Sequence, residues 1–157
     1  MFEGKMRLLQ YTRVQDGNQC IGAITSSDVV IQLTGNKLPY TSVVDLLGAG
    51  ETAINTARNI IGDISQHVAV DRSQIKLLSP ITKCEKIVCI GLNYKDHCAE
   101  QNLPLPEEPV VFSKFPSAIA ANGDTVILPN KLSENVDWEV ELAVIIGKTA
   151  KNVSKAS

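Results

Sequence analysis

Residues 136–147 read VDWEVELAVIIG, and this stretch is the one around which the fold is expected to form. Its β-branched residues and its early alternation of apolar and polar positions predict a β-strand. Alternate side chains of a strand share a face, so Asp137, Glu139 and Glu141 are expected on one side, with neighbours about 6.7 Å apart. Apolar residues fill the rest of both faces, which is typical of a buried strand and predicts that Trp138 lies in the core.

The three acids of this stretch allow two interpretations. A carboxylate that is buried needs a partner, because burial of an unpaired charge is costly, and a metal or acid–base site would supply one. A solvated acidic edge of a sheet would also explain the acids, but it would not explain the apolar side chain of Ile145 on the same face. Pattern alone leaves both interpretations open.

Composition excludes several classes of protein. With 157 residues, 44% hydrophobic and 20% charged, the chain is typical of a globular protein. A formal net charge of −2 without long Lys/Arg clusters argues against nucleic acid or an anionic membrane as the partner. The four cysteines form no CxxC pair, and the first residues resemble neither a signal nor a transit peptide. We therefore expect an intracellular protein, mitochondrial or cytoplasmic, without a clear targeting peptide.

An α+β module is predicted for residues 1–74. Strands are expected at 6–14, 19–24 and 29–33, with a type I′ hairpin turn at Asp16-Gly17. Two helices should follow, one capped by Thr41 or Ser42 and one over 51–61. Nothing in this module points to chemistry of its own.

A second domain is predicted for residues 75–157. Its expected elements are strands at 87–90, 110–112, 125–128 and 136–147, a short helix over 93–101 and a turn at 122–124.

The short helix carries a second candidate site. His97 and Glu100 are three residues apart, so both lie on one side of a helix, where a carboxylate can orient an imidazole that acts as a general base. A solvated surface pair has the same spacing and is the commoner case. Lys114 is a candidate contact for a substrate anion, although a solvated amine is the better default.

Taken together, four segments resemble the fumarylacetoacetate hydrolase family. They are IGLNYKDHCAE at 90–100, EPVVFSK at 108–114, NGD at 122–124 and VDWEVELAVIIGK at 136–148. The order and spacing of the upstream NYxxHxxE and the downstream ExE make the resemblance specific. It implies a mixed β-barrel or roll in the second domain, so the fold class expected for the whole chain is α+β.

The resemblance also implies a site and a chemistry. Glu139 and Glu141 match two metal-ligand carboxylates of the family, usually for Mg²⁺, and such oxygen ligands also suit Mn²⁺ or Ca²⁺. His97 and Glu100 match a catalytic dyad on a lid over the substrate. Substrates of the family are 2-oxo and β-diketo acids, including oxaloacetate-like ones, which are hydrolysed, decarboxylated or tautomerised. Full-length members are expected to be homodimers.

One departure from the family pattern bears on activity. The resemblance implies a third metal-binding carboxylate, an aspartate, some tens of residues after Glu141, and no Asp or Glu follows Glu141 in this sequence. We therefore expect a fragment with impaired activity. The alternative expectation is a non-catalytic product that acts by association with an intact subunit.

Overall fold

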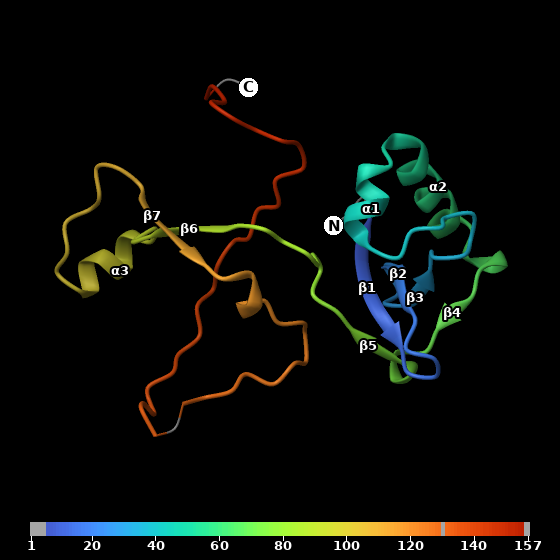
Figure 1. Cartoon of the computed structure of the whole chain (residues 1–157), viewed down its shortest axis with the longest axis horizontal. Coiled ribbons are helices and arrows are strands. Elements are labelled where there is room, and N and C mark those ends of the chain that lie inside the picture. Colours follow the sequence, from blue (N-terminus) through green and yellow to red (C-terminus); the bar gives the residue numbers. More distant parts are fainter. Residues whose placement is uncertain (1–5, 130, 156–157) are drawn as a thin grey trace. The chain divides into compact units, whose positions relative to one another are not determined.

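The computed structural model describes residues 6–129 and 131–155, with the side chain of Gln66 excepted. Contacts divide the chain into two units, residues 1–125 and 126–157, and each is described by itself. Figure 1 gives the element labels that are used below.

The N-terminal part contains an antiparallel sheet of five strands in the order β4-β3-β2-β1-β5 (Figure 1). The strands are β1 Arg7–Arg13, β2 Gln19–Ile24, β3 Val30–Gln32, β4 Ala69–Val70 and β5 Ile75–Leu77. The first three confirm the predicted strands. The sequence did not predict β4 and β5.

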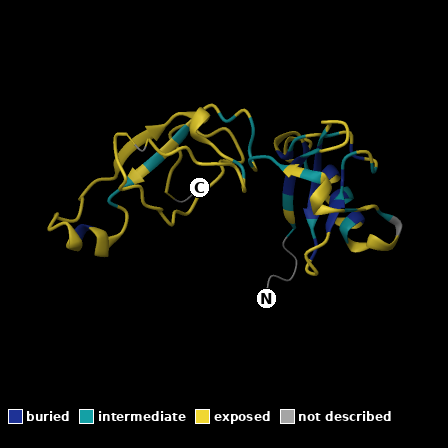
Figure 2. Cartoon of the chain, turned by 90° about the horizontal axis from the view of Figure 1, so that it is seen from below, coloured by how far each residue is buried: buried dark blue, intermediate teal, exposed yellow. Residues whose placement is uncertain are grey.

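Two helices, α1 Val43–Gly48 and α2 Glu51–Gly62, confirm the predicted pair. Ser42 caps α1, since its hydroxyl accepts a hydrogen bond of 3.1 Å from the Asp45 N–H. The helices bury their apolar side chains together with those of one sheet face, and Figure 2 shows the buried residues gathered in this module. The members of this core are Ile21, Ala23, Ile31, Leu33, Leu38, Val43, Leu46, Ala53, Ala57 and Ile60.

The opposite face of the sheet holds a smaller core of Leu9, Tyr11, Cys20 and Val30. Tyr11 is fully buried, and its hydroxyl donates a 3.3 Å hydrogen bond to Gln32. Burial, reinforced by the neighbouring Cys20 thiol and opposed by Arg13, raises the pKa of Tyr11 to about 12. Gly22 lies across from this ring, and a Cβ there would be 2.9 Å from the Ile31 carbonyl oxygen. Close approach of β2 to β3 therefore requires glycine at this position.

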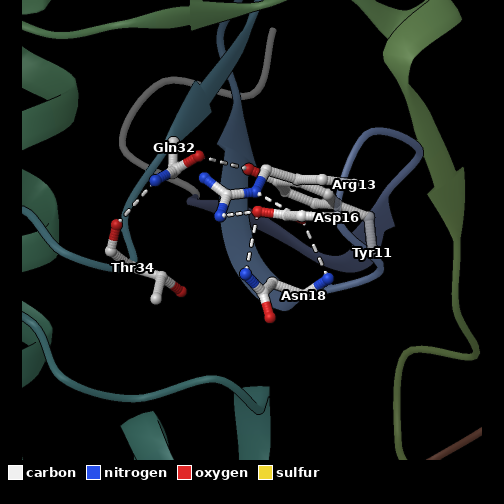
Figure 3. A network of polar contacts seen from close by, with 6 residues as sticks. All are labelled: Tyr11, Arg13, Asp16, Asn18, Gln32 and Thr34. Atoms are coloured by element: carbon white, nitrogen blue, oxygen red, sulfur yellow. Dashed lines mark hydrogen bonds and ion pairs between the residues drawn. The ribbon is translucent and has the colours of Figure 1, made fainter.

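The β1–β2 hairpin is closed by side chains (Figure 3). Asp16 pairs with the Arg13 guanidinium at 2.5 Å and accepts the Asn18 N–H at 3.0 Å. The Asn18 N–H is the main cause that holds the pKa of Asp16 below its usual range, and Arg13 adds to it. Gly17 has a φ of 69°, as expected, but Asp16 is not among the residues with positive φ. The type I′ prediction is therefore wrong: the loop is longer, and the Gly17 N–H donates to the Arg13 carbonyl at 2.8 Å.

A two-stranded antiparallel ribbon follows, made of β6 Ile87–Gly91 and β7 Val110–Lys114. The connection between its strands carries helix α3 Lys95–Glu100. These elements confirm the strand–helix–strand order predicted for 87–112. The remaining short elements are 3₁₀ turns, namely η1 Ile64–Gln66, η2 Arg72–Gln74 and η3 Pro116–Ala118.

The strands expected at 125–128 and 136–147 are absent, and those predictions are wrong for this structure. Trp138, expected in the core, has 78% of its surface exposed. A strand that is apolar on both faces needs neighbouring strands for its backbone groups and a packed layer on each side. Within residues 131–155, which the structure describes, no segment forms a strand that could pair with 136–147 or cover one of its faces.

The chain is thus a mixed α+β protein with antiparallel pairing in both sheets. The sheet of the N-terminal module extends through β5, three residues past position 74. The division into domains at 74/75 stays a prediction.

Candidate active site

Helix α3 is held to the end of β6 by a buried thiol. Cys98 has only 1% of its surface exposed, and its Sγ lies 3.7 Å from the carbonyl oxygen of Leu92. Leu92 has a φ of 52°, so the chain turns sharply as it leaves the strand. With Cys98 facing inward, neighbouring positions of this short helix face outward.

The C-terminal end of α3 is a Schellman motif. The Asn102 N–H donates to the Ala99 carbonyl at 3.1 Å, and the Leu103 N–H donates to the Cys98 carbonyl at 2.9 Å. Asn102 has a φ of 52°, a left-handed conformation that asparagine tolerates better than most residues. The sequence therefore specifies where α3 ends, and with it the orientation of its last turn.

The predicted dyad lies on the outward side of this turn. His97 Nδ1 is 3.9 Å from Glu100 Oε2, and both side chains are more than half exposed. Gln101, which the sequence analysis missed, places its Nε2 2.9 Å from His97 Nε2. The spacing of four residues between His97 and Gln101 is the signal that could have found it. The roles of His97 and Glu100 stay predictions.

Lys114 does not share this location. The ribbon register pairs Gly91 with Val110, next to the connection that carries α3, and pairs Ile87 with Lys114 at the other end. Four residues along a strand span about 13 Å. The structure thus brings His97 and Glu100 together but sets Lys114 at the far end of the ribbon, and its substrate contact stays a prediction.

The carboxylates predicted to bind metal belong to the second unit. Glu139 and Glu141 lie in its extended and exposed segment, where Asp137 accepts a 2.8 Å hydrogen bond from the Trp138 N–H. Carboxylates are the right donor type for Mg²⁺. No group of three or more His, Cys, Asp or Glu side chains that could hold a metal occurs among the described residues. The carboxylates of Glu139 and Glu141 therefore suit Mg²⁺, but the described residues do not bring a complete set of ligands together.

Two hollows formed by described residues lie elsewhere. One, of about 430 Å³, is lined by polar residues of the hairpin network, including Arg13, Asn18 and Thr34 (Figure 3). The other, of about 350 Å³, is lined mainly by apolar side chains, including Leu9 and Val30 of the smaller core and Leu77, which packs against it. Neither is lined by a predicted site residue.

Comparison with known proteins places these segments in context. A family model described as "Fumarylacetoacetate (FAA) hydrolase C-terminal" matches residues 86–157. The chain is 50% identical over 111 residues to a Xenopus laevis protein named oxaloacetate tautomerase fahd2, mitochondrial, a match that covers 71% of this chain and 34% of that protein. An oxaloacetate tautomerase of Rattus norvegicus, also named mitochondrial, is 47% identical over 74% of this chain and 36% of its own length.

A third relative matches nearly the whole chain. The fumarylacetoacetate hydrolase domain-containing protein 2 homolog of Dictyostelium discoideum is 36% identical over 98% of this chain and 50% of its own length. The chain thus spans a third to a half of the length of these relatives. A solved fumarylacetoacetate hydrolase from Exiguobacterium antarcticum has a similar fold, with a TM-score of 0.52 at 22% identity over 73% of this chain and 37% of that one.

Among the described residues, no helix has the length and apolar character needed to cross a bilayer.

Proposed function

Because the chain belongs to the fumarylacetoacetate hydrolase family, we propose that it carries the proton-transfer and metal-binding segments of an enzyme of 2-oxo acids. Oxaloacetate is the substrate we favour, and keto–enol tautomerisation is the reaction, since relatives at 47–50% identity are named for it. The observation that carries the proposal is the His97–Glu100 contact of 3.9 Å on a helix with defined ends.

The proposed reaction moves one proton in each direction. Neutral His97 removes a proton from C3 of the keto acid, and the C3–H electron pair becomes the carbon–carbon double bond of the enolate. The resulting imidazolium then gives a proton to the enolate oxygen, which completes the enol and restores neutral His97. Glu100 orients the imidazole and stabilises its charged form.

Glu139 and Glu141 would hold a divalent cation in this proposal, Mg²⁺ first and Mn²⁺ or Ca²⁺ as alternatives. When bound, such a cation supplies positive charge that stabilises a developing enolate. Since the described residues gather no set of three ligands, we expect weak metal binding and impaired activity from this chain.

A second candidate function is non-catalytic association with a longer member of the family. Segment 136–147 exposes a strand-like series of apolar side chains, of which Trp138 is 78% and Leu142 88% exposed. Such a segment, and the open edges of the β6–β7 ribbon, are suited to pairing with another sheet.

A tautomerase assay separates the two candidates. The absorbance of enol-oxaloacetate is followed with and without Mg²⁺ for the wild-type chain, Glu139→Gln and Glu141→Gln. We expect a weak, Mg²⁺-dependent acceleration in the wild type that both variants lose. Glu134→Gln is the matched control, because it removes a carboxylate outside the predicted ligand set.

Each result of the assay has one meaning. Acceleration that survives in Glu139→Gln and Glu141→Gln contradicts the metal-binding roles. No acceleration in any chain supports the association function over the catalytic one. For the catalytic protein we further propose a mitochondrial location, which rests on the names of the relatives, and a homodimer at full length.

A further inference from the structure

We propose that Gln101 is a positioning residue for His97, one that holds the imidazole in the tautomer with its proton on Nδ1. This inference rests on the proposed function, because it specifies how the proton acceptor of that site is prepared. It uses the contact of 2.9 Å between the side-chain nitrogen of Gln101 and Nε2 of His97.

The direction of this hydrogen bond decides the tautomer. A side-chain amide nitrogen only donates, so Nε2 of His97 must accept through its lone pair. An imidazole that accepts at Nε2 is neutral and carries its single proton on Nδ1. That nitrogen faces Glu100 Oε2 at 3.9 Å. The two neighbours therefore act in the same sense, one donating to Nε2 and one attracting the Nδ1 proton.

The helix geometry makes the arrangement possible. Residues three and four positions apart share a side of a helix, so Glu100 and Gln101 both reach His97. The backbone of Gln101 is itself fixed, since its N–H donates to the His97 carbonyl at 3.2 Å. Asn102 then turns the chain away, which keeps the Gln101 side chain at the end of the helix.

The consequence for the reaction concerns which atom takes up the proton. Gln101 keeps the lone pair of Nε2 unprotonated and directed away from Glu100, so Nε2 is the atom that accepts the C3 proton. A single lone pair cannot serve two donors, and the exposed Gln101 amide therefore gives way when the substrate approaches.

Nuclear magnetic resonance of the imidazole nitrogens tests this directly. The chain has only two histidines, so the spectrum of His97→Asn assigns both, and His67 serves as the internal control. Spectra of the 157-residue chain are recorded at a pH where both rings are neutral, without metal or substrate. The variants are Gln101→Met, which keeps the length but not the donor, and Gln101→Glu, which can only accept.

The expected result is a graded order. The fraction of His97 with its proton on Nδ1 should be highest in the wild type, lower in Gln101→Met and lowest in Gln101→Glu. For a solvent-exposed pair at this spacing we expect a change of about 1.4- to 2.3-fold in the tautomer ratio for Gln101→Met. The ratio for His67 should not change.

An unchanged His97 ratio in both variants would overturn the proposal, and so would equal shifts at His67, which would indicate a change in the whole fold. Since no turnover is measured, failure here is distinct from failure of the proposed function, which the enol assay reports.

Discussion

At the scale of single residues, two buried positions show how the N-terminal module depends on its side chains. Tyr11 is a fully buried phenol whose pKa is raised to about 12. Gly22 lies where the carbonyl of Ile31 and the ring of Tyr11 leave no room for a Cβ. Each position leads to a prediction about stability.

Tyr11→Phe should reduce the decrease in the free energy of unfolding that occurs at alkaline pH. A raised pKa means that the folded state favours the neutral phenol. The resulting contribution of Tyr11 to the free energy of unfolding is fully present below pH 10, the pKa in the unfolded state. It is lost as the pH rises towards 12, the pKa in the folded state. We expect the free energy of unfolding of the wild type to fall by on the order of 2 kcal/mol more than that of the variant over this range. Urea titrations at successive pH values measure it, with Tyr40→Phe as the control; parallel curves for wild type and Tyr11→Phe would refute the assignment.

Gly22→Ala should destabilise the sheet by about 1–3 kcal/mol. The added Cβ would lie 2.9 Å from the Ile31 carbonyl oxygen, and a paired strand backbone cannot move away easily. Gly62→Ala is the matched control, because a Cβ at the end of α2 meets nothing within 4 Å and alanine favours a helix. The midpoint of urea unfolding should fall for the first variant and stay or rise for the second. Equal midpoints for Gly22→Ala and the wild type would show that β2 and β3 leave room for a Cβ at position 22.

At the scale of elements, the short helix α3 is the part on which the candidate site depends. It has only six residues, too few for intrinsic helix propensity to stabilise it. Its order therefore comes from the buried Cys98 and from the Schellman motif at Asn102.

Asn102→Val should unfold the last turn of α3, since a β-branched side chain in the left-handed region costs at least 1–2 kcal/mol. Hydrogen exchange of the Leu103 amide, which is bonded to the Cys98 carbonyl, should become roughly 5- to 30-fold faster. Asn102→Gly keeps the conformation accessible and should keep the protection. Undiminished protection in Asn102→Val would mean that the cap does not hold the helix.

What the sequence could predict at this scale followed from local chemistry. Alternating or helical patterns long enough to recognise predicted β1, β2, β6, α2 and the pairing of His97 with Glu100 along one turn. The contact of Gln101 with His97 was not predicted, although its spacing of four residues is the helical one. The prediction of a strand at 136–147 failed although its pattern is strong, because a strand exists only with neighbours, which local sequence cannot supply.

At the scale of the whole molecule, order is unevenly distributed. Buried residues are concentrated in the five-stranded sheet and its two helices, whereas residues 131–155 are exposed throughout the described part (Figure 2). The His97–Glu100 pair lies in the first unit and the Glu139–Glu141 pair in the second.

Amide hydrogen exchange should be slow where buried residues are concentrated and fast in the exposed segment. We expect amides of β1 and β2 to exchange slowly and those of 142–146, which lie in no helix or strand, to exchange much faster. Slow exchange at 142–146 would indicate that the segment pairs with another strand in solution, which is the arrangement expected for the association function.

Proton removal from C3 is the step that the proposed function assigns to His97, and it can be measured as isotope exchange. Deuterium incorporation at C3 of oxaloacetate is followed by proton magnetic resonance in deuterated buffer with Mg²⁺, for the wild-type chain, His97→Asn and His67→Asn. We predict exchange above the protein-free rate for the wild type and for His67→Asn, and exchange at the protein-free rate for His97→Asn. Equal acceleration by wild type and His97→Asn would show that His97 does not remove the proton.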